Sequence, residues 1–237
     1  MMQVIQSKDR YFGDHGWLQA RWHFSFGDYH DRRNMNWSAL RVFNDDVIQP
    51  GQGFPAHPHR DMEIVTYVLD GVVRHGDNLG NRGLIKAGEV QVMSAGRGIE
   101  HQEFNGSETE PVHLLQLWIM PRTRGNEPRW EQRSWSGDGT DVRDGVLHPV
   151  VSGDGKIPGT LAIDQDAAVY VAKLSPGQDL THRSEPNRHA YLFVIDGDVT
   201  LNGDTTLAKG DQARIADEPA LTIRAGSNAH LILLDLP

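Results

Sequence analysis

Two pairs of side chains able to bind a metal ion share the same spacing in the sequence. His57 and His59 are two residues apart, and His101 and Glu103 repeat that spacing 42 residues after His59. In an extended chain, residues two apart project from the same face, so two neighbouring strands would direct three imidazoles and one carboxylate to a single point. This donor set suits a borderline divalent ion such as iron, manganese, nickel, copper or zinc. A six-coordinate ion would keep two positions open for chemistry.

The two pairs are informative together and weak apart. An isolated His-x-His pair is more often a surface pair or a hydrogen-bonded core pair than a ligand pair. Here the second pair follows Gly96-Arg97-Gly98, and Pro58 separates the first two histidines. Because proline cannot donate to a strand ladder, Pro58 indicates a strand start, an edge or a bulge, all of which are common beside functional sites. The combination favours a metal site.

The composition limits the other chemistry available to the 237 residues. There are 12 histidines and no cysteine, which excludes disulfides, thiolate zinc sites, iron–sulfur clusters and thiol nucleophiles. The net charge of −9 argues against a broad nucleic-acid surface. No apolar run approaches the roughly 20 residues of a membrane helix, and the first residues lack the basic and apolar regions of an export signal. We therefore expect a cytoplasmic protein that binds neither nucleic acid nor membrane directly.

The elements that would position the four residues are predicted to be strands. Few windows have the apolar spacing of a long amphipathic helix, whereas short runs rich in Val, Ile, Leu, Tyr and Thr recur between glycine-bearing turns. The chain is therefore predicted to be all-β. The clearest predicted strands are Leu40–Val47, Glu63–Leu69, Val90–Ser94, His113–Met120, Ala168–Leu174, Ala190–Ile195, Ala220–Arg224 and His230–Leu234.

An internal repeat predicts two similar domains. Residues 67–73 are matched by residues 193–199 at an offset of 126, and residues 84–89 by residues 206–211 at an offset of 122. The two offsets differ by four residues, which is a difference in loop length. Residues 133–144 are rich in Gly, Ser and Asp, as in a linker. We therefore predict an N-terminal domain of residues 1–134 and a C-terminal domain of residues 135–237.

These motifs resemble those of a known family. Residues 51–71, with Gly51, His57-Pro58-His59, Glu63 and Gly71, resemble the first cupin motif, and residues 98–105 (GIEHQEFN) resemble the second. More narrowly, residues 57–69 (HPHRDMEIVTYVL), 75–80 (HGDNLG) and 93–99 (MSAGRGI) are similar to the pirin family, including the bacterial pirin-like quercetinases. The similarity extends over nearly the whole chain, including residues 22–26.

The resemblance implies a fold, a metal site and an activity. The fold would be a bicupin of two β-barrels in tandem, with one metal ion in the N-terminal barrel held by the residues His57, His59, His101 and Glu103. The implied activity is that of a quercetin 2,3-dioxygenase, in which dioxygen opens the heterocycle of a flavonol and carbon monoxide is released. As an anionic ligand, Glu103 would also serve as general base for the 3-hydroxyl proton of the flavonol.

The resemblance also implies cofactors, partners and an alternative. We expect one divalent transition metal ion per chain, with iron preferred and nickel, copper, manganese, cobalt and zinc compatible with the same donors. The partners would be a flavonol and dioxygen, and two fused barrels favour a monomer. The alternative is a regulatory or sensor protein of the pirin type, in which the oxidation state of the metal changes a surface that binds other proteins. The sequence does not separate the two functions.

The C-terminal barrel is predicted to lack metal ligands. Applying the offset of 126 places Arg183 opposite His57, Glu185 opposite His59 and His189 opposite Glu63. Among the other histidines, His75 and His113 are predicted to be structural and hydrogen-bonded. An aromatic-rich stretch near the N-terminus, with histidines at 15, 23 and 30, is predicted to cover a sheet edge rather than a substrate.

Two glutamates, Glu63 and Glu103, are candidates for the carboxylate ligand. If the strand that carries His57 continues unbroken, alternation places Glu63 on the ligand face too, and in cupins at large the glutamate at that position is the usual ligand. The pirin pattern favours Glu103. We therefore expect Glu103→Ala to lose the metal and Glu63→Ala to keep most of it, as measured by elemental analysis of the purified variants. The reverse result would contradict the assignment of Glu103.

Overall fold

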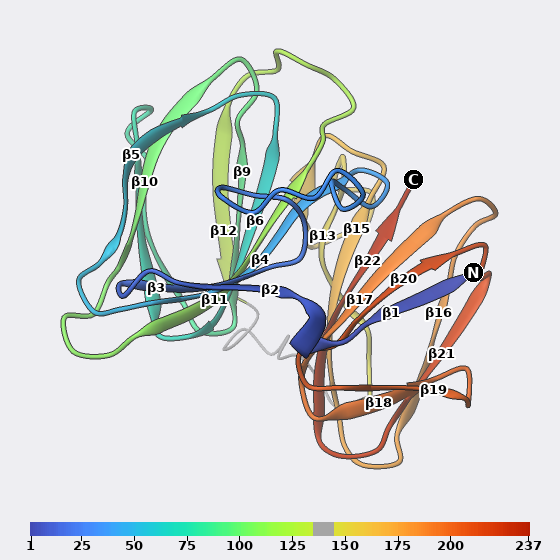
Figure 1. Cartoon of the computed structure of the whole chain (residues 1–237). Coiled ribbons are helices and arrows are strands. Elements are labelled where there is room, and N and C mark those ends of the chain that lie inside the picture. Colours follow the sequence, from blue (N-terminus) through green and yellow to red (C-terminus); the bar gives the residue numbers. More distant parts are fainter. Residues whose placement is uncertain (135–144) are drawn as a thin grey trace. The chain divides into compact units, whose positions relative to one another are not determined.

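Nearly all of the regular structure is β-strand. The computed structural model describes residues 1–134 and 145–237, and within these ranges the single helix is the short 3₁₀ turn η1 (Ser7–Asp9). The strands form two compact units, each with two sheets (Figure 1). The prediction of an all-β chain is confirmed. A search of the described residues for a helix long and apolar enough to span a bilayer found none.

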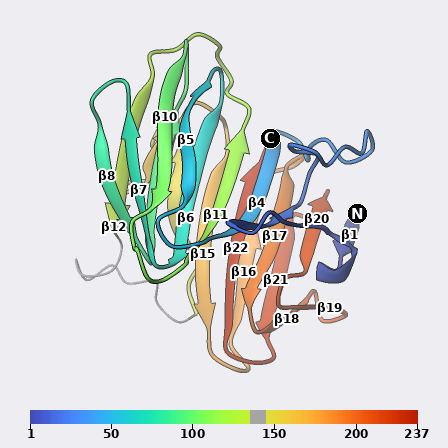
Figure 2. The same ribbon diagram turned by 60° about the vertical axis from the view of Figure 1, so that its left-hand side comes forward.

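The N-terminal unit contains residues 11–134 and the short strand β14 (Leu161–Ile163). Its larger sheet has the strand order β12 (Arg129–Ser134), β9 (Glu89–Ser94), β6 (Glu63–Asp70), β11 (Val112–Ile119), β4 (Leu40–Ile48), β3 (Leu18–Trp22) and β2 (Tyr11–Asp14). Its smaller sheet has the order β5 (Gly53–His59), β10 (Ile99–Asn105), β7 (Val72–Asp77) and β8 (Arg82–Lys86), and these four strands are seen side by side in Figure 2. The ladders given for both sheets are antiparallel.

The C-terminal unit repeats this arrangement. Its larger sheet contains, in order, β1 (Met2–Ile5), β20 (Gln212–Ala216), β17 (His189–Asp196), β22 (Ala229–Leu236), β15 (Ala168–Leu174) and β13 (His148–Gly153). Its smaller sheet has the order β16 (Asp179–Arg183), β21 (Ala220–Ala225), β18 (Asp198–Leu201) and β19 (Thr205–Ala208). Alternate side chains of both sheets enclose one apolar core that includes Leu192, Leu201, Leu207, Ile223 and Leu233.

The repeat seen in the sequence corresponds to repeated hydrogen bonds. Gly71 lies between β6 and β7, and Gly197 lies between β17 and β18, where the chain passes from the larger to the smaller sheet of each unit. Their φ angles are 78° and 75°, values that glycine adopts without steric cost. Gly88 N–H donates to the Val68 carbonyl at 2.9 Å, and the equivalent Gly210 N–H donates to Val194 at 2.8 Å. The same turns therefore close both units.

The division of the chain is less simple than a single cut. Residues 1–10 group with the C-terminal unit, where β1 pairs with β20, and residues 161–165 group with the N-terminal unit. The predicted linker lies largely within residues 135–144, outside the described residues. The boundary between residues 134 and 135 therefore stays a prediction.

Strand β1 generates a prediction about stability. Its four backbone pairs cover the edge of β20, and Met2 and Val4 pack against the C-terminal core. Removing residues 1–5 is expected to lower the free energy of unfolding of this unit by about 2 kcal/mol, mainly through lost apolar burial. Hydrogen exchange should accelerate at the β20 amides and stay unchanged at those of β10, which serves as the internal control. Unchanged exchange at β20 would show that β1 contributes nothing to the unit.

Candidate metal centre

The four predicted ligands lie on two neighbouring strands. In the β5–β10 ladder, His101 pairs with His57 and Ile99 with His59. Along β10 the residues alternate between buried and exposed, so His101 and Glu103 both face the interior of the unit. A register shift between them places Glu103 opposite Phe54. Such an irregularity changes the direction of a side chain beside a site. Pro58 itself is regularly paired with Glu100, and β5 is an edge strand, one of the positions that Pro58 indicated.

The three imidazoles form a compact group. Their ring centroids are 4.8 Å apart for His57 and His59, 4.5 Å for His57 and His101, and 4.8 Å for His59 and His101. One ring nitrogen from each lies within 4.8 Å of the others. The Nδ1 of His57 lies 2.8 Å from the Pro55 carbonyl, and a proton on that nitrogen leaves Nε2 free to bind a metal.

His101 provides the test of whether this group fits a metal ion. Both of its ring nitrogens are buried and neither has a hydrogen-bond partner among the described residues. Leaving a buried polar group without a partner costs on the order of 1–3 kcal/mol. A metal ion bound to one of these nitrogens would remove part of that cost, so the residues present fit a metal centre.

Glu103 lies beside the imidazoles and is held from two sides. Its carboxylate and the rings of His75 and His101 form a second group with ligand atoms within 4.8 Å of one another. Gln91 donates its amide to Oε1 at 2.6 Å, and Gln116 donates to Oε2 at 2.8 Å. Both oxygens are therefore fixed, and each keeps a lone pair for another partner.

Two tryptophans complete this network. The indole N–H of Trp130 donates to the Gln91 amide oxygen at 2.8 Å, and that of Trp118 donates to the Gln116 amide oxygen at 3.0 Å. Each glutamine is thus oriented, with its amide oxygen engaged and its amide nitrogen directed at Glu103. Neither glutamine was predicted from the sequence, because each reaches Glu103 from the other sheet of the unit, on β9 and β11.

His75 is a further residue that the sequence analysis assigned differently. It was predicted to be a satisfied structural histidine, but its buried Nδ1 has no partner in the described part of the chain. Its Nε2 lies 3.3 Å from the Asp77 carboxylate, and its ring stacks on Trp130 at 5.1 Å. The register pairs it with Glu103, a neighbour that only the strand pairing reveals. His113, in contrast, is bonded to Asp45 at 2.6 Å, as expected of a structural residue.

The other candidate carboxylate, Glu63, belongs to neither group. Strand β5 ends at His59, Asp61 has a φ of 49°, and β6 begins at Glu63, so the extended run does not continue from His57. Glu63 accepts a hydrogen bond from Ser94 at 2.5 Å, and Arg129 donates to the same hydroxyl. Burial raises its pKa. The geometry favours Glu103 over Glu63 as the ligand.

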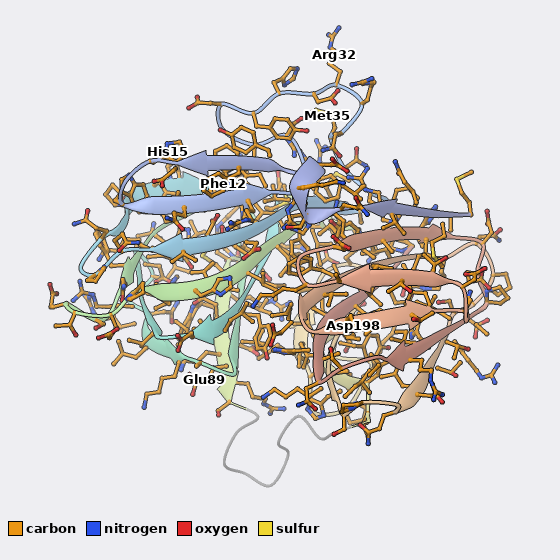
Figure 3. All side chains as sticks on the ribbon, turned by 60° about the horizontal axis from the view of Figure 1, so that its bottom comes forward. Phe12, His15, Arg32, Met35, Glu89 and Asp198 are labelled. Atoms are coloured by element: carbon orange, nitrogen blue, oxygen red, sulfur yellow. The ribbon has the colours of Figure 1, made fainter. Side chains whose placement is uncertain are left out.

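Aromatic side chains surround one side of the centre. The Trp118 ring meets His59 edge-on at 4.8 Å and Phe26 at 5.3 Å, and Phe54 lies 6.2 Å from His57. A hollow of about 460 Å³ opens beside His59. The N-terminal aromatic stretch includes β3, which pairs with the edge strand β2, and its Phe26 contacts Trp118. The hairpin of these strands carries Phe12 and His15 (Figure 3).

The charge state of the centre suits metal binding. Burial, together with the neighbouring imidazoles, lowers the pKa of His59 and of His101 to about 4. Burial alone would raise the pKa of Glu103, but His101, His75 and the Gln116 amide hold it below its usual value. Near neutral pH His59 and His101 are therefore neutral and the Glu103 carboxylate is ionised, which are the forms that bind metals.

The C-terminal unit has a different residue set at the same place. His182 pairs with Leu221 and Leu180 with Ile223, which repeats the pairing of His59 with Ile99 and of His57 with His101. The offset there is 122 to 123 rather than 126, so the predicted equivalence of Arg183 and Glu185 to His57 and His59 is wrong. Leu180, Ile223 and Ala225, two residues beyond Ile223, occupy the other three positions.

His182, the one metal-binding side chain among these four equivalent positions, is hydrogen-bonded to protein groups. His182 Nε2 lies 2.9 Å from Asp235 Oδ2 and 3.0 Å from the Ser184 hydroxyl. Both partners meet the same ring nitrogen, so this is not the relay of a hydrolytic triad, in which they would meet opposite nitrogens. Only one of the four positions carries a metal-binding side chain.

Fold and centre together define a bicupin with an imidazole–carboxylate centre in its N-terminal barrel. A family model described as Pirin matches residues 5–119, and one described as Quercetinase C-terminal cupin domain matches residues 149–236. A quercetin 2,3-dioxygenase of Escherichia coli K12 is 44% identical over all of this chain and 99% of its own length. A pirin-like protein of Caulobacter vibrioides is 47% identical over 94% of each chain. The chain belongs to the pirin family.

Solved structures agree with this membership. The crystal structure of the bacterial pirin YhhW from Escherichia coli in complex with nickel(II) has a TM-score of 0.93 and 43% identity, and the match covers 100% of this chain and 99% of that one. A second crystal structure of YhhW from Escherichia coli gives a TM-score of 0.94. The bicupin architecture is therefore confirmed.

The lowered imidazole pKa values generate a prediction about pH. In metal-free protein, His59 and His101 should titrate near pH 4, well below the usual 6.5. Because the unfolded chain then binds more protons than the folded one, stability should fall as the pH drops from about 6.5 to 4. NMR titration of the imidazole Cε1–H signals, with urea melts at matched pH, measures both effects. Titration of these two residues near 6.5 would show that burial does not lower their pKa.

Proposed function

We propose that this chain is a metal-dependent dioxygenase that opens the heterocycle of a flavonol such as quercetin and releases carbon monoxide. The observation that carries the proposal is the group of three imidazoles, with the two unpartnered nitrogens of His101 at its centre. Relatives similar over the full chain and named quercetin 2,3-dioxygenase support the reaction class. The site hypothesis is that His57, His59, His101 and Glu103 hold the metal.

The metal would supply Lewis acidity, lowering the pKa of the flavonol enol and making the ring accessible to dioxygen. We propose iron as the native ion. Nickel(II) is the ion named with the related bacterial pirin, and the nitrogen and oxygen donors here suit either metal.

Glu103 would bind the metal and accept a proton from the substrate. Its pKa is held low, so it is ionised, and its two hydrogen bonds fix its orientation. A carboxylate in this state can take the 3-hydroxyl proton of a flavonol if that hydroxyl comes within hydrogen-bond distance. Since Gln91 and Gln116 donate only through their amide nitrogens, neither competes with Glu103 as a base.

The aromatic side chains would serve the planar substrate. Trp118 and Phe54 lie next to His59 and His57, and their rings offer apolar contact to a flavonol bound at the centre. The regulatory alternative is not favoured, because the similar proteins are named for the dioxygenase reaction. Cytoplasmic location and a monomeric state stay predictions.

Turnover of quercetin tests the proposal. Metal-loaded protein should consume dioxygen and release carbon monoxide when quercetin is added, and His59→Ala should lose both activities by at least a hundredfold because the centre loses one imidazole. His113→Gln is the matched control, since His113 lies in the same unit but contacts Asp45. An oxygen electrode and a carbon monoxide assay measure the two gases. Metal-loaded protein that turns over no flavonol would overturn the proposal.

A further inference from the structure

The outer face of the small N-terminal sheet has a gap in its side-chain cover. Gln102, Gly76 and Arg82 are directly paired across β10, β7 and β8, and so they form one row on this face. Side chains directly opposite each other in a sheet project from the same side. Because glycine stands in the middle of the row, this part of the sheet is covered only by the ends of the Gln102 and Arg82 side chains. A Cβ at Gly76 would lie 3.4 Å from Gln102 Nε2 and 3.8 Å from Arg82 Nη1.

A second row continues the surface with apolar groups. Phe104, Arg74 and Leu84 are paired across the same three strands, two residues from the first row. The Arg74 guanidinium lies over the Phe104 ring at 5.8 Å, and Leu84 is 53% exposed. The side chains of the two rows, together with His75 and Gly83, line a hollow of about 470 Å³, a volume within the usual range for small-molecule sites.

The charged side chains that line this hollow are both arginines. Arg74, Arg82 and Gln102 present guanidinium and amide N–H groups, and the lining contains no acidic residue. Neither arginine forms an ion pair within residues 1–134 and 145–237. In a chain with a net charge of −9, two neighbouring arginines without a carboxylate are unusual, and guanidinium groups bind carboxylates in a bidentate manner.

We propose that this hollow is a binding site for an aromatic carboxylate. The carboxylate would lie between Arg82 and Gln102 and within reach of Arg74, and the ring would contact Phe104 and Leu84. A free inorganic anion would use the first row alone, whereas an aromatic acid uses both rows. The ligands of the metal centre point to the opposite face of β10, so this site is distinct from it.

The inference does not depend on the proposed reaction. Ring opening of a flavonol with loss of carbon monoxide leaves a benzoate ester that bears a carboxylate, so the product would belong to the ligand class, and this link alone rests on the proposed function. Binding can be measured without turnover, which keeps the two proposals separable.

Calorimetric titration of the whole protein with benzoate tests the site. Saturable 1:1 binding is expected, with affinity reduced at least tenfold by Arg82→Gln and by Gly76→Leu. The leucine would fill the gap without altering charge, and Gly76 lies in a strand with no positive φ, so its backbone tolerates a side chain. Arg21→Gln is the matched control, because Arg21 also lies over an aromatic ring, that of Phe12, at 4.7 Å. It should bind within twofold of the unaltered protein.

The other outcomes would each overturn the proposal. If benzoate binds the Gly76→Leu and Arg82→Gln variants as tightly as it binds the unaltered protein, its site lies elsewhere, for example on the metal. Phosphate binding as tightly as benzoate would show that the apolar row contributes nothing, and equal losses in Arg21→Gln would indicate general electrostatics. Metal content and melting temperature of each variant establish folding, and Arg74→Gln provides a second charge variant if Gly76→Leu does not fold.

Discussion

The structure of the N-terminal unit depends on providing partners for the polar side chains that it buries. His101 and Glu103 face inward because strand β10 alternates, and burial there is costly for any group without a partner. The carboxylate is satisfied by Gln91 and Gln116, each oriented in turn by a tryptophan. The network also requires a residue without a side chain at position 83. A side chain at Gly83 would lie 2.6 Å from the Trp130 ring, so glycine is required for Trp130 to reach both Gln91 and His75.

The C-terminal unit shows the same strands without that constraint. Leu180, Ile223 and Ala225 belong to its apolar core, at the positions that His57, His101 and Glu103 hold in the other unit. The fold therefore does not need a polar centre. Each apolar replacement adds buried hydrophobic surface and removes a partner requirement, so the polar centre is costly for stability and is retained where chemistry requires it. His182, the remaining imidazole, is buried only with Asp235 and Ser184 as partners.

Much of this arrangement could be predicted from the sequence, for identifiable reasons. All eight predicted strands are present to within two residues at each end, because each is a continuous apolar or alternating run between turn residues. The ligand pairs were visible because strand alternation has a strict period of two. His75 and the two glutamines were not, since His75 meets Glu103 by cross-strand pairing and the glutamines meet it from the other sheet, relations that depend on loop lengths and sheet packing. The same cause made the offset of 126 fail at β16, and the pairing of β1 with β20 joins residues about 210 apart in sequence.

Strand β10 connects the two faces of the small sheet. His101 and Glu103 project inward while Gln102 and Phe104 project outward, and the same register with β7 aligns Glu103 with His75 and Gln102 with Gly76. A slip of one residue would expose the metal ligands and bury Gln102 at once, so a single pairing determines both surfaces. The inner face is costly to bury and is fixed by its hydrogen bonds. The outer face carries no such network, so its geometry is fixed by the strand register that the inner face determines. The arginines and Gly76 are therefore positioned by residues that they do not contact.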